Sequence, residues 1–200
     1  MAFEFGEVSY RLREILLASF DQVPDTYGAP ISLDGDQMME VDPQADTDML
    51  RDSGRNRRAL AVVTHGDINL QAGGFDWGSI AILTGATAET CGSTPSRVRE
   101  VLYPELLPYF GAIGVADTDD DGVFVVGLRM CKLNKRFKYT FDGTQNRFMV
   151  NDDLGGVALF YDDGTNDIMD KVRVYETAAD WDTAKPSDGA EFRSFFDSVP

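Results

Sequence analysis

Apolar and polar residues alternate along much of the chain, which is the period of a β-strand. The strongest run is Val123–Leu133, which is apolar on both faces and is therefore predicted to be a central strand covered on both sides. Its predicted faces are Phe124, Val126, Leu128 and Met130 on one side, and Val123, Val125, Cys131 and Leu133 on the other. Further runs predicted to be strands are 37–41, 59–64, 68–70, 97–103, 109–116, 137–141, 148–150, 157–161 and 172–175, with a break at His65-Gly66.

One segment, residues 76–84, has the pattern of a helix. Asp76 is a favourable N-cap, and Gly85 stands where a left-handed residue ends a helix. Its predicted apolar face consists of Trp77, Ile80, Ala81 and Leu83. Residues 3–20 fit either a helical stripe or a strand.

The two least apolar stretches differ in what they predict. Residues 43–58 are charged and nearly without core residues, so we expect a long protruding loop there. Residues 177–200 are also polar, but Phe192, Phe195 and Phe196 have an amphipathic spacing. We therefore expect this C-terminal tail to pack back on the rest of the chain.

Composition and charge narrow the class of protein. The chain has 200 residues, 43% of them hydrophobic, with no internal repeat or composition boundary, so residues 1–200 are interpreted as one domain with its own core. The 34 acidic residues comprise 25 Asp and 9 Glu against 18 basic residues, which gives a net charge of −16. Asp and Gly favour turns between strands, and this charge opposes binding of nucleic acid through its phosphates. Residues 1–10 lack the features of a secretory signal, and no apolar run reaches the ~20 residues of a membrane span.

The sharpest local motif is the acidic segment Asp117-Thr118-Asp119-Asp120-Asp121-Gly122. Acids at positions 1, 3 and 5 with Gly at position 6 match the calcium loop of an EF-hand. The bidentate Glu expected at position 12 is replaced by Leu128, and strands are predicted on both sides. We therefore interpret the segment as an acidic turn between two strands, with Asp117, Asp119 and Asp121 as the alternative, a weak cation site.

Few residues suggest catalysis or a cofactor. His65 is the only histidine and has no nucleophile motif beside it, and no phosphate-binding or dinucleotide-binding loop is present. Cys91 and Cys131 are interpreted as two small buried residues, with a disulfide as the alternative. We therefore predict no catalytic residue, no cofactor and no enzymatic activity.

The arginines of residues 43–58 form one basic island in an acidic chain. They are Arg51, Arg55, Arg57 and Arg58. Three interpretations are open: a solvated loop, contact with nucleic acid, or contact with an acidic patch on another subunit. The last is favoured, because the arginine fork suits carboxylates at interfaces.

Several short motifs follow one another in a definite order. They are Phe5-Gly6 leading to Leu12-Arg13-Glu14-Ile15; Tyr27-Gly28-Ala29-Pro30; Gln71-Ala72-Gly73-Gly74 followed by Asp76-Trp77 and Leu83-Thr84-Gly85; Pro108-Tyr109-Phe110-Gly111; a long strand ending in Lys132-Leu133; an aromatic strand; and residues 172–176. In this order the chain resembles the major tail (tail tube) proteins of tailed viruses, from Phe5 to Glu176.

The resemblance implies a β-sandwich or barrel-type fold with one short helix, and a strand over residues 8–15. It implies rings, usually of six subunits, whose sheets join edge to edge into an inner barrel and which stack into a hollow tube that conducts viral DNA without binding it specifically. The loop 43–58 would reach the neighbouring ring, with Met49, Arg51, Arg55, Arg57 and Arg58 at that contact. The implied partners are further copies of the chain, the tape measure protein, the tail terminator and distal tail or baseplate proteins. The implied location is the virion tail, assembled in the host cytoplasm.

The charge fits that interpretation, since a negative lumen repels phosphate. An Asp-rich, Lys-poor chain with a pI of about 4.3 also suits high salt, so we hypothesise a virus of a salt-loving host, with an archaeal host as one option. The alternatives are a tail terminator, a capsid decoration protein, a calcium-binding adhesion module, and an enzyme whose substrate the sequence does not indicate.

Overall fold

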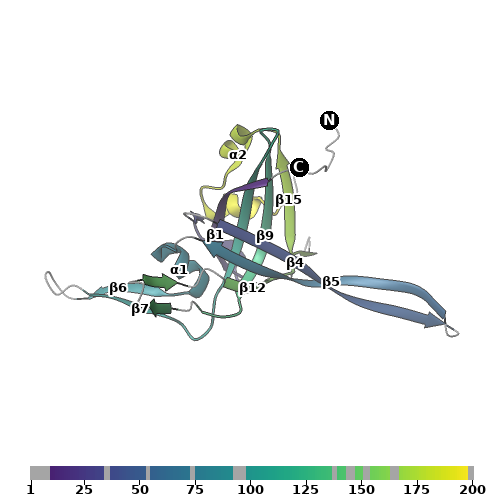
Figure 1. Cartoon of the computed structure of the whole chain (residues 1–200), viewed down its shortest axis with the longest axis horizontal. Coiled ribbons are helices and arrows are strands. Elements are labelled where there is room, and N and C mark those ends of the chain that lie inside the picture. Colours follow the sequence, from purple (N-terminus) through teal and green to yellow (C-terminus); the bar gives the residue numbers. More distant parts are fainter. Residues whose placement is uncertain are drawn as a thin grey trace.

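Most of the described chain forms one antiparallel sheet of nine strands (Figure 1). The structure is a computed structural model, and it describes residues 10–33, 37–52, 55–72, 75–91, 98–136, 139–142, 147–150, 154–162 and 167–197. The nine strands are β1 (Tyr10–Asp21), β2 (Thr26–Tyr27), β3 (Ile31–Ser32), β4 (Gln37–Asp52), β5 (Arg55–Ala72), β8 (Tyr109–Thr118), β9 (Val123–Leu133), β12 (Leu154–Leu159) and β15 (Asp170–Tyr175). Their order is β2-β1-β8-β9-β12-β5-β4, with β3 also beside β1 and β15 also beside β9. The expected mainly β fold is confirmed, and so is a strand over residues 10–15.

β9 is the strand around which the sheet is built, and its bounds are those predicted from the alternation. Along one edge it pairs with β8. Along the other edge it pairs first with β15, from Val123 to Leu128, and then with β12, from Met130 to Leu133. The sheet therefore divides into two branches beyond β9.

The two faces of β9 do not keep one alternation from end to end. Near its middle, β9 advances three residues while β8 advances two, which is a β-bulge. Beyond the bulge, Met130 packs in the cluster of Val123, whereas Cys131 and Leu133 pack in the cluster of Leu128. The predicted faces are therefore wrong for these last three residues, because one inserted residue reverses the alternation.

Two hydrophobic clusters cover the two faces of the sheet. The first lies between the curled sheet and α1 (Trp77–Thr84), and the second lies under α2 (Ala178–Ala184) and α3 (Gly189–Ser194). Fully buried members of the first include Ile15, Leu17, Leu70, Leu83, Phe110 and Leu128; those of the second include Ile113, Val123, Val125, Trp181, Phe192 and Phe196. A Cβ atom on Gly127 would lie 2.3 Å from the Phe195 ring, so α3 packs directly on β9.

The helix α1 forms where it was predicted. The Asp76 carboxylate accepts from the backbone N–H of Ser79 at 2.7 Å, and Gly85 takes the left-handed conformation at φ 69°. Ile80 and Leu83 are buried as expected, but Trp77 is 48% exposed, so the predicted apolar face is wrong at that position. Trp77 is the first residue of the helix, and the buried residues of the helix begin at Ser79.

The C-terminal tail packs back on the sheet, as predicted, through Phe192, Phe195 and Phe196. It does so as two further helices, so the expectation of one helix is wrong. Thr177 caps α2 by accepting from the Asp180 N–H at 3.2 Å, and Asp188 caps α3 by accepting from the Glu191 N–H at 2.8 Å. These caps compensate for the weak helix propensity of an Asp-rich segment.

The expected loop 43–58 is also wrong, because these residues belong to paired strands. β4 and β5 pair from Gln37–Ala72 at the body to Asp52–Arg55 at the far end. β5 does not end at the predicted break at His65, although Thr64 beside it is the extra residue of a bulge. A two-stranded ribbon satisfies its inner backbone groups without a core, so low hydrophobicity is no obstacle to it.

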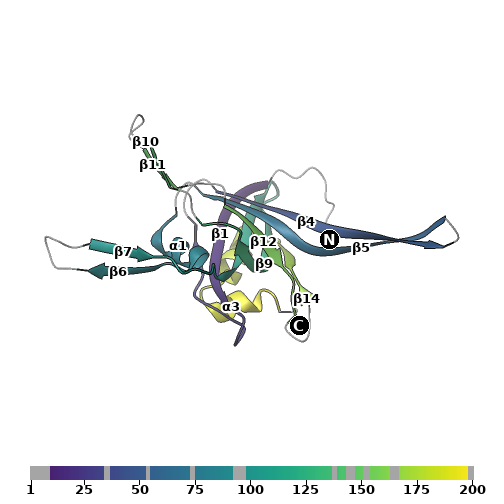
Figure 2. The same cartoon turned by 90° about the horizontal axis from the view of Figure 1, so that it is seen from below.

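Two more hairpins project from the body (Figure 2). They are β6 (Thr87–Cys91) with β7 (Val98–Leu102), and β10 (Tyr139–Asp142) with β11 (Arg147–Val150). In the described part of the chain, each of these strands pairs only with its hairpin partner, as do the short strands β13 (Tyr161–Asp162) and β14 (Asp167–Ile168). The body thus carries several thin extensions that have no second layer.

We predict that the N-cap of α1 makes stability sensitive to acid. Hydrogen bonds from the Ser79 side chain and backbone hold the pKa of Asp76 below its usual range. Its contribution is therefore complete above the unfolded-state pKa and is lost as the pH falls through the lower folded-state pKa. Asp76→Ala should lower the free energy of unfolding by about 1 kcal/mol at neutral pH, and the difference should shrink in acid. Urea titrations at both pH values measure this. Asp76→Asn keeps a capping oxygen that does not titrate, so a loss as large as that of Asp76→Ala would contradict the assignment.

Candidate assembly surfaces

The longest projection is the outer part of the β4–β5 hairpin, residues 43–52 and 55–66, which we call the arm. Its side chains leave the body at Gly66, where a Cβ atom would still touch Met169 and Val41. From Gly66 to Arg55 the arm runs ~36 Å at ~3.3 Å per residue. The first residue outward from Gly66, His65, is half-buried. The following residues of β5, from Thr64 to Ala61, are exposed. These described side chains of β5 are therefore open to solvent and not packed on the body.

The predicted contact residues lie in the outer half of the arm. The register pairs Leu50 with Arg58 and Asp52 with Arg55, so the arginines cluster around the tip of the hairpin. The side chains of Met49, Arg51, Arg55, Arg57 and Arg58 lie outside the described residues. Their position at the end of a ribbon is established, and their contacts remain a prediction.

Three strand edges of the sheet have no partner among the described strands. β15 pairs only with β9, and β4 pairs only with β5. The first residues of β1, Tyr10 to Glu14, pair with β8 on one side, whereas β2 and β3 cover only the later part of β1. Such edges present rows of backbone N–H and C=O groups that can accept another strand.

An apolar part of the sheet is exposed next to one of these edges. We call it the apolar sheet face: Phe124 and Val126 of β9 with Val172 and Val174 of β15. The register pairs Val126 with Val172 and Phe124 with Val174, so the four side chains share one face. Val172 is 48% exposed and Val174 is 39% exposed, while the two residues of β9 are half-buried.

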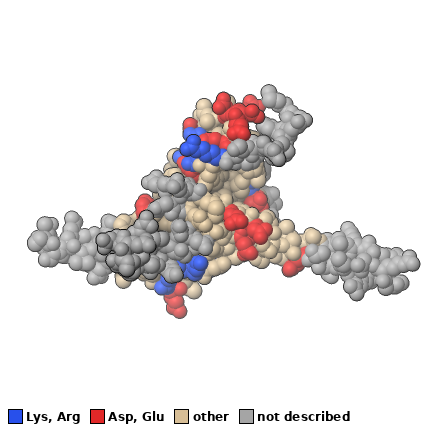
Figure 3. Space-filling view, viewed as in Figure 1, with Lys and Arg blue, Asp and Glu red and all other residues tan. Residues whose placement is uncertain are grey.

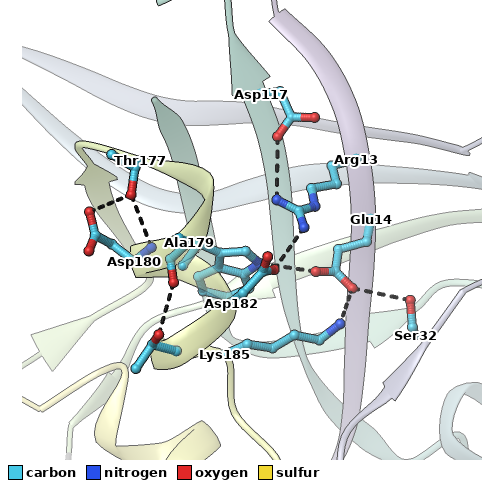
Figure 4. A network of polar contacts seen from close by, with 11 residues as sticks. Arg13, Glu14, Ser32, Asp117, Thr177, Ala179, Asp180, Asp182 and Lys185 are labelled. Atoms are coloured by element: carbon cyan, nitrogen blue, oxygen red, sulfur yellow. Dashed lines mark hydrogen bonds and ion pairs between the residues drawn. The ribbon is translucent and has the colours of Figure 1, made fainter. Parts of the chain in front are cut away.

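The opposite face is closed by α2, which a polar network ties to β1 (Figure 4). Glu14 is buried and accepts hydrogen bonds from the Trp181 indole N–H at 3.0 Å, from Lys185 Nζ and from the Ser32 hydroxyl at 3.4 Å. The neighbouring Arg13 pairs with Asp182 at 2.7 Å and with Asp117 at 3.7 Å.

A β-bulge explains why two adjacent residues of β1 serve the same helix. The register with β8 skips Arg13, since Leu12 pairs with Ala116 and Glu14 with Val115. The extra residue disrupts the alternation, so Arg13 and Glu14 both reach α2 instead of pointing to opposite faces. Sequence reasoning missed this network, although a Glu among apolar residues in a strand was a signal that could have found it.

The helix α3 is anchored by arginines. Arg193 pairs with Asp25 at 2.8 Å, and the fully buried Arg129 lies 3.6 Å from the same carboxylate. The backbone carbonyl of Arg129 accepts from the Tyr27 hydroxyl at 2.7 Å, and burial raises the pKa of Tyr27. Arg173 of β15 donates to the Phe195 carbonyl at 2.6 Å. These contacts hold α3 on the sheet. Among the described residues, the open strand edges, the apolar sheet face and the arm are candidate surfaces for partners.

The acidic segment is a turn between β8 and β9, as predicted. The Thr118 N–H donates to the Gly122 carbonyl at 2.9 Å, and Asp121 takes a left-handed φ of 62°. Asp117 is paired with Arg13 and does not converge on a site with Asp119 and Asp121. No group of three or more His, Cys, Asp or Glu within the described ranges is arranged to hold a metal ion.

The structure also describes the surroundings of His65 and Cys131. His65 lies at the base of the arm, 3.0 Å from the Thr64 hydroxyl and 3.8 Å from Asp67. Cys131 is a free, fully buried thiol whose pKa is raised by burial, and the side chain of Cys91 lies outside the described residues. Among the described helices none is long and apolar enough to cross a membrane.

We predict that Glu14 contributes more to stability than the neighbouring Arg13. Glu14→Ala removes a buried acceptor and leaves the Trp181 N–H without it, so the free energy of unfolding should fall by roughly 2–3 kcal/mol. Arg13→Ala, the control, breaks partly exposed ion pairs and should cost no more than about 1 kcal/mol. Denaturant unfolding followed by tryptophan fluorescence measures both. Equal losses in the two variants would show that α2 is held by packing alone.

Comparison with known proteins adds no relative. No family model matches the chain, and no curated protein matches it significantly. In Figure 3, acidic groups lie at the upper end of the body with basic groups beside them, and a further acidic patch lies within the uncharged surface lower down. The functional assignment therefore rests on the surfaces of this chain: open strand edges, an exposed apolar sheet face, an unsupported arm and a net charge of −16.

Proposed function

We propose that this chain is a structural subunit that assembles with copies of itself into rings, and that the rings stack into a hollow tube that conducts viral DNA. It would be the major tail protein of a tailed virus, as the order of its sequence motifs suggests. Its role would be mechanical and not catalytic.

The proposal rests on strands of the described chain that have a partner on one side only. β4 and β15 are each paired on one side only, and the arm extends ~36 Å with its two strands alone. An isolated two-stranded hairpin is marginally stable in water, and exposed strand edges promote association. Copies of the same chain would supply the missing partners at both features.

Ring closure would use the two outer strands of the β1-β8-β9-β15 part of the sheet. β15 is open along its outer side, and β1 is open from Tyr10 to Glu14. Because the two open edges lie at opposite ends of these four strands, pairing β15 of one copy with β1 of the next is a heterologous contact, which closes into a ring when the rotation allows.

The charge supports passage of DNA without retention. A net charge of −16 per subunit is repeated in every copy, so an assembled ring carries a strong negative field. DNA binding by proteins depends largely on cations that neutralise phosphate, and this chain has an excess of anions. Tape measure, terminator and baseplate proteins are the further partners that such a tube requires.

Electron microscopy of the purified protein in negative stain tests the proposal directly. Rings or tubes with a central channel are expected. A monomer at all concentrations would refute the proposal, and single rings that never stack would favour a tail terminator. Binding of calcium with a rise in melting temperature would instead favour an adhesion module.

We predict that the arginines at the tip of the arm connect one ring to the next. Changing Arg55, Arg57 and Arg58 together to Glu should block stacking, because the new carboxylates would face an acidic partner surface. Circular dichroism should stay unchanged, since the three positions lie at the far end of a two-stranded hairpin. Sedimentation and microscopy measure the outcome, and tubes of normal length would remove these residues from the contact.

We also predict that assembly requires high salt. Screening lengths fall from ~8 Å at physiological ionic strength to ~3 Å in molar salt, so repulsion between the acidic copies is relieved only there. The assembled fraction should rise steeply with sodium or potassium chloride. Light scattering across a salt series measures it. Tubes equally stable in dilute buffer would contradict the idea of a salt-loving host as well.

A further inference from the structure

β4 is the longest of the strand edges that stay open among the described strands. It has 16 residues and lies at the end of the strand order, paired only with β5. β15 has 6 residues, and β1 is open only from Tyr10 to Glu14. Two β4 strands paired antiparallel about a two-fold axis would therefore be the most extensive edge contact between two copies. That contact would end in a dimer and not in a ring.

Pro43 lies in the β4 edge with its nitrogen on the outer side. Thr64, the extra residue of the β5 bulge, donates from its hydroxyl to the Gln44 carbonyl at 3.4 Å, so the backbone groups of Gln44 face β5. Successive residues of an antiparallel strand direct their backbone groups to opposite sides, so those of Pro43 point away from β5. Proline has no N–H, and its ring fills the space of that hydrogen. A strand added at this edge would meet a missing donor and a steric obstacle.

Carboxylates follow the same edge. Glu40, Asp42 and Asp46 alternate along one face of β4, and all three are exposed. The side-chain amide of Gln44 donates to the Asp42 carboxylate at 2.8 Å and so holds this charge beside Pro43. In a two-fold pair of β4 strands, the acidic row would face the same row of the other copy. Like charges directly opposite each other destabilise such a pair.

From these observations we infer that Pro43 and the carboxylates beside it close the β4 edge to a second copy, so that copies join through β15 and β1 and not through β4. The inference deepens the proposed function and rests on it, because it states which open edge is excluded from assembly. β15 and residues 10–14 of β1 contain no proline. The inference concerns β4 up to Asp46, and the tip of the arm stays the proposed contact between rings.

The two barriers at this edge respond differently to salt. Repulsion between exposed carboxylates extends over ~8 Å at physiological ionic strength but only ~3 Å in molar salt. The missing N–H of Pro43 does not depend on salt, because a strand added there leaves one carbonyl without its hydrogen bond in either solution. In the high salt in which we expect assembly, Pro43 therefore provides most of the discrimination between edges.

The first experiment opens the edge by substitution. Pro43→Thr together with Asp42→Thr restores the outward donor and removes the charge beside it. This double variant should form a dimer at protein concentrations at least about tenfold lower than the wild type, since the two-fold pair regains its hydrogen bonds. The matched control is Pro104→Thr with Glu105→Thr, the same change of charge at two exposed positions between β7 and β8, which should associate as the wild type does. Sedimentation equilibrium measures association, and circular dichroism checks folding.

The single variants separate the two barriers. Pro43→Thr alone should promote the dimer in dilute buffer and in molar salt, whereas Asp42→Thr alone should promote it only in dilute buffer. A double variant that associates no more than the wild type in either solution would overturn the inference, because neither residue would then be what closes the edge.

The second experiment follows the β4 edge by amide hydrogen exchange. The amides of Val41 and Ala45 point outward, as the nitrogen of Pro43 does. Those of Asp42 and Gln44 point toward β5 and serve as the internal control. Exchange is carried out in the assembled state, and the protein is then dissociated for NMR. In wild-type assemblies the outward amides should exchange as fast as in the monomer, whereas in the dimer of the double variant they should slow at least about tenfold.

The outcomes separate this inference from the proposed function. Wild-type tubes in which the Val41 and Ala45 amides still exchange fast support both. Wild-type tubes in which these two amides are protected overturn the inference, because β4 then joins copies, and they leave the function standing. A wild type that stays monomeric at all concentrations refutes the function, while dimers formed by the double variant alone would still support the closure of the β4 edge.

Discussion

The structure depends on β9 being apolar on both faces. A strand of this kind must be covered on both sides, and the chain does so with α1 and the curled sheet on one side and with α2 and α3 on the other. Because β15 and β12 share one edge of β9, the sheet divides there and β15 becomes an outer strand. Val172 and Val174 are exposed as a result, since the first cluster ends before it reaches them.

β-Bulges in β1 and β9 place residues that hold the helices α2 and α3 on the sheet. The bulge at Arg13 turns two adjacent charged residues toward α2, and the bulge in β9 sends Met130 to the helical side. Glu14 then accepts from Trp181 in a buried position, where a hydrogen bond to a charged group is worth more than at the surface. The helices α2 and α3 are thus held on the sheet by directional contacts as well as by packing.

Sequence reasoning predicted the features that depend on local pattern and missed those that depend on pairing. The bounds of β9 and the caps of α1 follow from alternation and from Asp76 and Gly85, which act within a few residues. The faces of Met130 and Cys131 could not be predicted, because a bulge is set by the partner strand. The helix α3 had a sequence signal in Asp188 followed three residues later by Glu191, and α2 had one in Thr177 followed by Asp180, but the low apolar content of this segment argued against helices. The arm was taken for a loop because its residues lack core character, and only the partner strand makes them a ribbon. The apolar sheet face lay outside sequence reasoning too, since neither Val126 nor Val172 shows its neighbour in the sequence.

The acidic charge and the uncharged surfaces act together on association. A net charge of −16 opposes every encounter between copies, so a nonspecific contact gains too little to persist. Only surfaces that bury apolar area or pair strand edges without bringing charges together can overcome that repulsion. Among the described residues, surfaces of this kind include the open edges of β15 and of the start of β1, and exposed apolar residues such as Val172 and Val174. A high charge therefore serves specificity, because it leaves the repeated, geometrically matched contact as the association that is favourable once salt has screened the rest.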